Sequence, residues 1–207
     1  MNQRSRFLAL KDEDRARWLD AAEQEFCALG YEKASLNRIL ANAGESKGRS
    51  YHYFSGKGEL FRATLERRIS QIDGLNEDLV LNARTAQAFW AETAALCTRL
   101  TAAFQQNAPL ANLMRVLHFE LAAQQSVAEP LATLRAKIEK ILITGQSLGA
   151  VRRDLPIDLL GMVALELAST IDRWFAQNAQ TLTDTEEQAL SQRAFSLIAA
   201  PFLPPSY

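Results

Sequence analysis

The sequence predicts an all-α protein of about nine helices arranged in two parts. Glycine and proline are few, 9 and 6 among 207 residues, and they fall between stretches of helical periodicity. Valine, isoleucine and threonine nowhere alternate with polar residues for long enough to favour a strand. Residues 33–68 carry eight basic and three acidic side chains, a net charge of +5, whereas residues 74–207 carry 10 basic and 13 acidic ones, a net charge of -3. We therefore expect a basic N-terminal part suited to a polyanion and a larger acidic part.

Four helices are predicted in the N-terminal part. The first spans about residues 12–29 and ends at Gly30, in the position of a C-cap. A short helix follows, with the Ser35 hydroxyl as its expected N-cap and its end at residues 42–44. Ser46 is the expected N-cap of a second short helix, which continues to about Tyr53. A longer helix then begins after residue 56, and its apolar face is made of Leu60, Phe61, Leu65, Ile69 and Ile72.

The C-terminal part repeats this pattern with longer helices. Their starts are marked at Thr85, Pro109, Pro130, Pro156 and Thr183, the last with Glu186 placed for a capping box. The helix that begins at Pro130 is expected to end near Gly145 or Gly149.

Composition narrows the class of protein. With 48% apolar and 23% charged residues and a net charge of -1, the chain can bury a core and is neither a disordered tail nor a polycation. It has no run of about 20 apolar residues, and the opening apolar run is too short for a signal peptide, so we expect a soluble intracellular protein. The chain has only two cysteines, Cys27 and Cys97, and two histidines. These are too few and too widely spaced for a disulfide scaffold or a metal centre, so we expect no metal or cofactor.

The two short helices, joined by a glycine-containing turn behind a longer helix, predict a helix-turn-helix. In that motif the second short helix presents its N-terminal side chains to the major groove of DNA. Arg49 has the planar fork that pairs with guanine, Lys47 supplies a flexible charge, and Gly48 permits close approach. The rings of Tyr51 and Tyr53 are equally consistent with core packing. The predicted DNA-binding residues are Ser35, Lys47, Gly48, Arg49, Ser50, Tyr51, His52, Tyr53 and Lys57.

Residues 14–65 carry several short motifs in a fixed order: GYEKAS at 30–35, ILANAG at 39–44, SKG at 46–48, YHYF at 51–54, and Lys57 with ELF at 59–61. In order and spacing they resemble the DNA-binding domain of the TetR family of transcriptional regulators. The resemblance implies an all-helical, Ω-shaped homodimer in the bacterial cytoplasm. It also implies a DNA-binding domain over residues 1–72, including the connecting helix, and an effector-binding and dimerisation domain over residues 73–207.

Three departures from the family's pattern stand out. Glu45 occupies a position that is usually apolar, and Ser50 one that is usually aliphatic. Gly56 and Gly58 replace the more usual Ser and Glu. Loss of a buried aliphatic side chain costs about 1 to 3 kcal/mol when nothing fills the space, and Glu45 brings a negative charge near the phosphates. We therefore expect a somewhat looser reading helix that still binds DNA.

A regulator of this kind needs a switch, so we expect an effector pocket in the C-terminal part. Its candidate lining residues are Phe89, Trp90, Phe104, Met114, His118, Phe119, Met162, Glu166 and Trp174, although ordinary core packing between helices is the more common role for the apolar ones. The apolar stripes from Leu160 to Trp174 and from Leu190 to Ile198 predict a four-helix contact between two copies of the chain.

The sequence thus favours a repressor that leaves a pseudo-palindromic operator when a small, largely apolar effector binds. Two alternatives remain open: a ligand-dependent activator, and a helical scaffold or adaptor with a weakened DNA-binding domain. An enzyme is disfavoured because the chain has no P-loop, no Gly-x-Gly-x-x-Gly and no serine nucleophile elbow, and lacks repeated Glu-x-x-His spacing.

Overall fold

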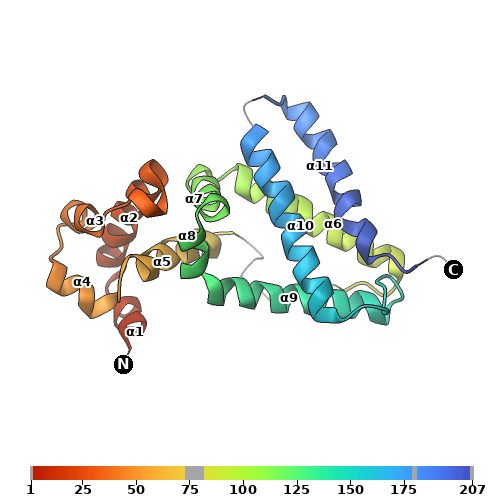
Figure 1. Ribbon diagram of the computed structural model, residues 1–207, viewed down its shortest axis with the longest axis horizontal. Coiled ribbons are helices and arrows are strands. Elements are labelled where there is room, and N and C mark those ends of the chain that lie inside the picture. Colours follow the sequence, from red (N-terminus) through yellow and green to blue (C-terminus); the bar gives the residue numbers. More distant parts are fainter. Residues whose placement is uncertain (1, 73–81, 179–180, 206–207) are drawn as a thin grey trace. The chain divides into compact units, whose positions relative to one another are not determined.

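The computed structural model describes residues 2–72, 82–178 and 181–205 (Figure 1). These residues form eleven α-helices, one short 3-10 helix and no strand. The all-α class predicted from the sequence is confirmed. Two short helices, α1 (Gln3–Leu8) and α8 (Leu121–Ser126), are absent from the prediction. Within the described ranges, no helix combines the length and the apolar character that a membrane span requires.

The helices belong to two compact units. Unit 1 combines the described part of residues 1–76 with residues 107–128, and unit 2 combines the described parts of residues 77–106 and 129–207. By packing, residues 107–128 therefore go with the N-terminal helices. The predicted border after residue 72 concerns function and stays a prediction.

Unit 1 is built around α2 and α5. Its elements are α1 (Gln3–Leu8), α2 (Asp12–Lys33), α3 (Leu36–Ala43), α4 (Lys47–Tyr53), α5 (Lys57–Ser70), α7 (Ala108–Phe119) and α8 (Leu121–Ser126). Five large side chains from α2, α3 and α5 are fully buried in its core: Trp18, Phe26, Ile39, Leu60 and Phe61. Burial of each contributes about 1.5 to 3 kcal/mol, so these side chains fix the scaffold on which α3 and α4 are mounted.

Unit 2 consists of α6 (Ala86–Gln105), α9 (Ala128–Ser147), α10 (Ile157–Asn178), α11 (Asp184–Ala199) and the 3-10 helix Ala200–Phe202. Phe89, Val151, Leu160 and Phe202 form the centre of its core. Gly145 makes room for this cluster, because a Cβ atom there would lie 2.5 Å from Val151 Cγ2 and 2.6 Å from Phe89 Cζ. The 3-10 helix is fixed in place by the Arg152 backbone N–H, which donates to the Phe202 carbonyl at 2.8 Å.

Most predicted helix ends are confirmed by the capping contacts. The Ser46 hydroxyl accepts from the Arg49 backbone N–H, and Thr183 with Glu186 forms both bonds of the capping box. One prediction is wrong: the Ser35 hydroxyl makes no capping hydrogen bond, although Ser35 occupies the N-cap of α3. The first regular helix breaks at Gly30 as predicted, and one further helical turn, to Lys33, belongs to α2 beyond this break.

Candidate nucleic-acid interface

Helix α4, the predicted reading helix, packs against the rest of unit 1 through Ser50, its one buried residue. The Ser50 side chain is 1% exposed, and its hydroxyl donates to the Lys47 carbonyl at 2.9 Å. A hydroxyl that is buried and hydrogen-bonded avoids the cost of an unsatisfied polar group. Ser50, one of the predicted DNA-binding residues, is therefore buried with its own partner at the position where the family's pattern has an aliphatic residue, and its contact with DNA stays a prediction.

The first turn of α4 faces solvent. Lys47, Gly48 and Arg49 are exposed, and Lys47 has no ion pair among the residues that the structure describes. A Cβ atom at Gly48 would meet nothing within 4 Å, so the backbone there is open to an approaching surface. An exposed cation next to bare backbone at a helix N-terminus is the arrangement that DNA phosphates and base edges require.

Glu45 and Arg49 form an ion pair at this surface. Both carboxylate oxygens lie 3.0 Å from Arg49 Nη1. The Glu45 side chain is 3% exposed and the Arg49 side chain 43% exposed. A hydrogen bond with Tyr53 and the charge of Glu45 raise the pKa of Arg49. The carboxylate of Glu45, which departs from the family's apolar pattern, is thus paired with the Arg49 guanidinium and is not an isolated negative charge at this surface.

The last turn of α4 is braced by the short helix α1. Gln3 Nε2 donates to the Tyr51 carbonyl at 2.8 Å, and Arg6 Nη1 donates to the His52 carbonyl at 3.4 Å. Phe7, which is 3% exposed, lies 6.1 Å from Tyr53 between ring centroids. The sequence reasoning missed these roles of α1, which has too few residues to show an apolar period.

Of the two tyrosines in α4, Tyr53 packs inward and Tyr51 does not. The Tyr53 ring lies 5.9 Å from the Trp18 ring between centroids, in an edge-on arrangement. The Tyr51 side chain is 53% exposed, and His52 is exposed beside it. Tyr51 and His52 are therefore available to a ligand, while Tyr53 belongs to the support of the helix.

The bend at Gly30, within α2, is held by two charged side chains. Gly30 has a φ of 77°, and beyond it the backbone N–H groups of Tyr31 and Glu32 donate to the Glu120 carboxylate at 3.1 and 2.6 Å. The Lys57 ammonium donates to the Tyr31, Glu32 and Ala34 carbonyls at 2.6 to 3.2 Å. The predicted phosphate contact of Lys57 stays a prediction, and making it costs the ammonium some of these three bonds.

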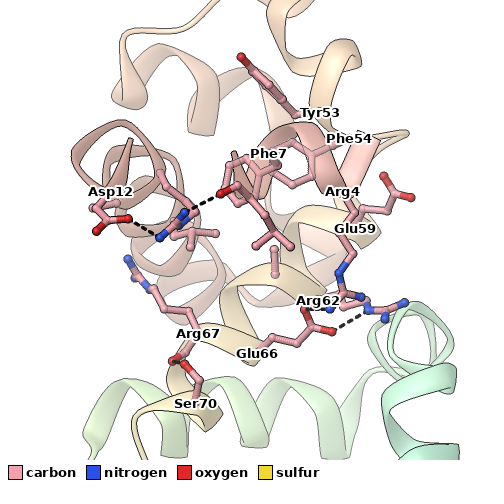
Figure 2. Close-up of a pocket in the computed structure, with 15 residues that line it drawn as sticks. Arg4, Phe7, Asp12, Tyr53, Phe54, Glu59, Arg62, Glu66, Arg67 and Ser70 are labelled. Carbon is pink, nitrogen blue, oxygen red and sulfur yellow. Dashed lines mark hydrogen bonds and ion pairs between the residues drawn. The ribbon is translucent and has the colours of Figure 1, made fainter. Parts of the chain in front are cut away.

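Unit 1 also contains a cavity of about 490 Å³ beside α1, α2 and α5. Figure 2 shows Arg4 and Arg62 converging on Glu66, with N–O distances of 3.0 and 2.9 Å. Phe7 and Leu19 add apolar lining. None of the nine predicted effector residues lines this cavity.

The predicted effector residues are divided between the two units. Met114, His118 and Phe119 lie on α7 in unit 1, where His118 is buried. The other described ones lie in unit 2, and the side chain of Phe104 falls outside the described residues. Phe89 is buried in the core and Trp90 packs against it, whereas Met162, Glu166 and Trp174 are exposed. The pocket stays a prediction.

Apolar side chains remain exposed on the two helices predicted to dimerise. Leu159, Met162 and Trp174 of α10 and Leu197 of α11 are 42% to 62% exposed. Leu160, the first residue of the predicted stripe, is instead 2% exposed and belongs to the unit's own core. Across the ranges that the structure describes, no cluster of three or more His, Cys, Asp and Glu side chains is arranged to hold a metal ion.

The fold and the solvent-facing cations of α4 define an all-helical protein with a helix-turn-helix. Residues 19–64 match the profile of the family described as bacterial regulatory proteins, tetR family. The resemblance predicted from the sequence is confirmed: the chain carries the helix-turn-helix domain of the TetR family.

Curated relatives match over short stretches of the chain. The transcriptional activator FasR of Mycolicibacterium smegmatis is 39% identical over 62 residues, which are 30% of this chain and 28% of FasR. The transcriptional repressor SCO4008 of Streptomyces coelicolor is 40% identical over 55 residues, 27% of this chain and 29% of that protein. The match therefore spans less than a third of the length of either relative.

Solved structures match over most of the chain. FadR from Bacillus subtilis, solved in complex with stearoyl-CoA, has a TM-score of 0.69 and 20% identity, and the match covers 89% of this chain and 97% of that one. NalD, the secondary repressor of the MexAB-OprM multidrug efflux pump in Pseudomonas aeruginosa, has a TM-score of 0.66 and 14% identity, with 93% and 98% covered. At this identity the likeness shows the fold.

Proposed function

We propose that the protein is a transcriptional regulator that binds a pseudo-palindromic operator as a homodimer. The observation that carries this proposal is the first turn of α4, where Lys47 and Arg49 are exposed beside the open backbone of Gly48. A single exposed helix end reads one half-site, so a twofold pair of chains suits two half-sites. The apolar side chains exposed on α10 and α11 supply the surface for that pairing.

The regulator is proposed to act as a repressor that a small, largely apolar effector releases from DNA. Support comes from the shared fold with FadR, whose structure holds stearoyl-CoA, and from the repressor name of SCO4008. The activator name of FasR keeps the alternative of a ligand-dependent activator. A reporter driven by the protein's own promoter separates the two, because a repressor lowers transcription and an activator raises it.

DNA binding is tested by measuring affinity for the protein's own promoter region at about 0.15 M salt. We expect the double substitution Lys47→Ala with Arg49→Ala to weaken binding by about 100-fold, since it removes a phosphate contact and a base contact. The matched control is Lys140→Ala with Arg84→Ala, which removes two exposed cations of unit 2.

The melting temperatures of both double variants show whether they are folded. A folded Lys47→Ala, Arg49→Ala variant that binds as tightly as the parent contradicts the assignment of α4 as the reading helix. Salt-insensitive DNA binding with a persistent protein partner supports the scaffold alternative instead.

A further inference from the structure

Arg49 is the base-reading side chain on which the proposed function rests, and its neighbour Glu45 has no role in that function. Glu45 precedes the N-cap of α4 by one residue, one helical turn before Arg49. Its carboxylate contacts Arg49 through Nη1 alone, with both oxygens at 3.0 Å. The contact therefore selects one of the two terminal nitrogens of the guanidinium.

The exposed fractions of the two side chains indicate that Glu45 supports Arg49. The Glu45 side chain is 3% exposed, so its carboxylate is beyond the reach of an approaching phosphate. The Arg49 side chain is 43% exposed and keeps one side toward solvent. Because a buried carboxylate that loses its cation is costly, the pair resists separation when DNA arrives.

A guanidinium offers five N–H donors in a fixed plane. With Nη1 directed at Glu45, the edge that bears Nε and Nη2 is the one that remains for a bidentate contact with guanine O6 and N7. Arg49 is thus oriented before DNA binds, which lowers the entropy cost of the base contact.

We propose that Glu45 is a positioning residue that sets base specificity: it holds Arg49 in the one orientation that reads a guanine. This inference rests on the proposed function and deepens it. It also gives the acidic departure from the family's pattern a purpose, since an apolar residue at position 45 cannot orient an arginine.

The test is a selection from a library of random-sequence duplexes with the parent, Glu45→Gln, Glu45→Ala and Arg49→Lys. Arg49→Lys, which keeps the charge and loses the planar fork, identifies the base position that Arg49 reads. We expect Glu45→Ala to lower the preference for guanine at that position by at least about tenfold, and to leave the other positions unchanged. Glu45→Gln, whose amide oxygen still accepts one N–H, is expected to give an intermediate loss.

Glu13→Ala is the matched control, because Glu13 is an exposed carboxylate of the same unit with no ion pair among the described residues. Its base preference should equal that of the parent. If Glu45→Ala fails to melt cooperatively, the comparison uses Glu45→Gln, which preserves the shape of the side chain.

Two outcomes overturn the inference alone. In the first, the Glu45 variants keep the guanine preference and bind every sequence more tightly, which would mean that the negative charge of Glu45 only weakens the attraction to DNA. In the second, preference falls evenly at all positions, as expected for a merely structural residue. A parent that enriches no sequence overturns the proposed function and the inference with it.

Discussion

The bend of α2 at Gly30 and the first turn of α4 both carry charged side chains, but the charges have different roles. At the bend, Glu120 accepts from two backbone N–H groups and Lys57 donates to three carbonyls, so both side chains serve the chain itself. On α4, Lys47 is exposed and unpaired among the described residues. Charge alone therefore does not mark a binding surface: a cation whose donors are already satisfied supports the fold, and a cation with free donors is available to a ligand.

The largest expected effect comes from breaking the bend with Gly30→Ala. A residue with a side chain is strained at a φ of 77°, and its Cβ atom would overlap Oε1 of Glu120. We expect the free energy of unfolding, measured by urea denaturation, to fall by about 2 to 4 kcal/mol. Gly48→Ala is the control, since a Cβ atom there meets nothing within 4 Å and alanine suits a helix. A Gly30→Ala variant as stable as Gly48→Ala contradicts the description of the bend.

Removing the carboxylate from the bend is expected to cost less. Glu120→Ala leaves the Tyr31 and Glu32 N–H groups to water and should lower the free energy of unfolding by about 1 to 3 kcal/mol. Faster hydrogen exchange at these two amides would locate the loss. The same substitution at the exposed Glu13 should change stability by less than about 0.5 kcal/mol. Equal losses in the two variants would contradict a specific contact at the bend.

Acid should weaken the start of α3 through Glu25. This buried carboxylate accepts from Arg38 Nε and from the Ser35 backbone N–H, both at 2.8 Å, and the Arg38 hydrogen bond holds its pKa below the ordinary 4.5. Because the pKa is lower in the folded state, the stabilisation is present above pH 4.5 and is lost as the pH falls below it.

We therefore expect the stability of the parent to decline between about pH 5 and pH 3 more steeply than that of Glu25→Gln. Thermal melts across this range measure the difference. Parallel pH profiles for the two proteins would show that the contact adds nothing.

Lys47→Ala should have the smallest effect on stability. Its side chain is exposed and contacts no charged partner among the described residues, so the free energy of unfolding should change by less than about 0.5 kcal/mol. Lys57→Met provides the contrast at the bend, where loss of three charge-assisted bonds should cost about 1 to 3 kcal/mol. Similar urea midpoints for the two variants would contradict the proposed difference between the bend and the first turn of α4.

Local signals in the sequence were sufficient for the all-α class and for α3 and α4. The glycine at position 44 and the caps at Ser46 and Thr183 are read from neighbours a few residues away, and the structure agrees. The break of the helix at Gly30 is predictable for the same reason, since the positive φ of a glycine is a local property.

Contacts between residues far apart in the sequence could not be predicted from these local signals. Glu120 lies 88 residues from Glu32, and nothing local to either marks the contact. The short helix α1 depends on Phe7 packing against Tyr53 and Phe54, so it forms through tertiary contacts and not through its own periodicity. For the site, the exposed residues of α4 follow from the sequence, whereas the burial of Glu45 behind Arg49 does not.

We expect Lys47 to contact DNA phosphate, and we expect the three carbonyl bonds of Lys57 to keep its ammonium group in the fold. The most direct test of these two roles is the salt dependence of affinity for the promoter duplex, measured for the parent, Lys47→Ala and Lys57→Met at a temperature where all three are folded. We predict that Lys47→Ala reduces the slope of log affinity against log salt by about one and that Lys57→Met leaves it unchanged. A reduced slope for Lys57→Met with an unchanged slope for Lys47→Ala would show that these two roles are reversed.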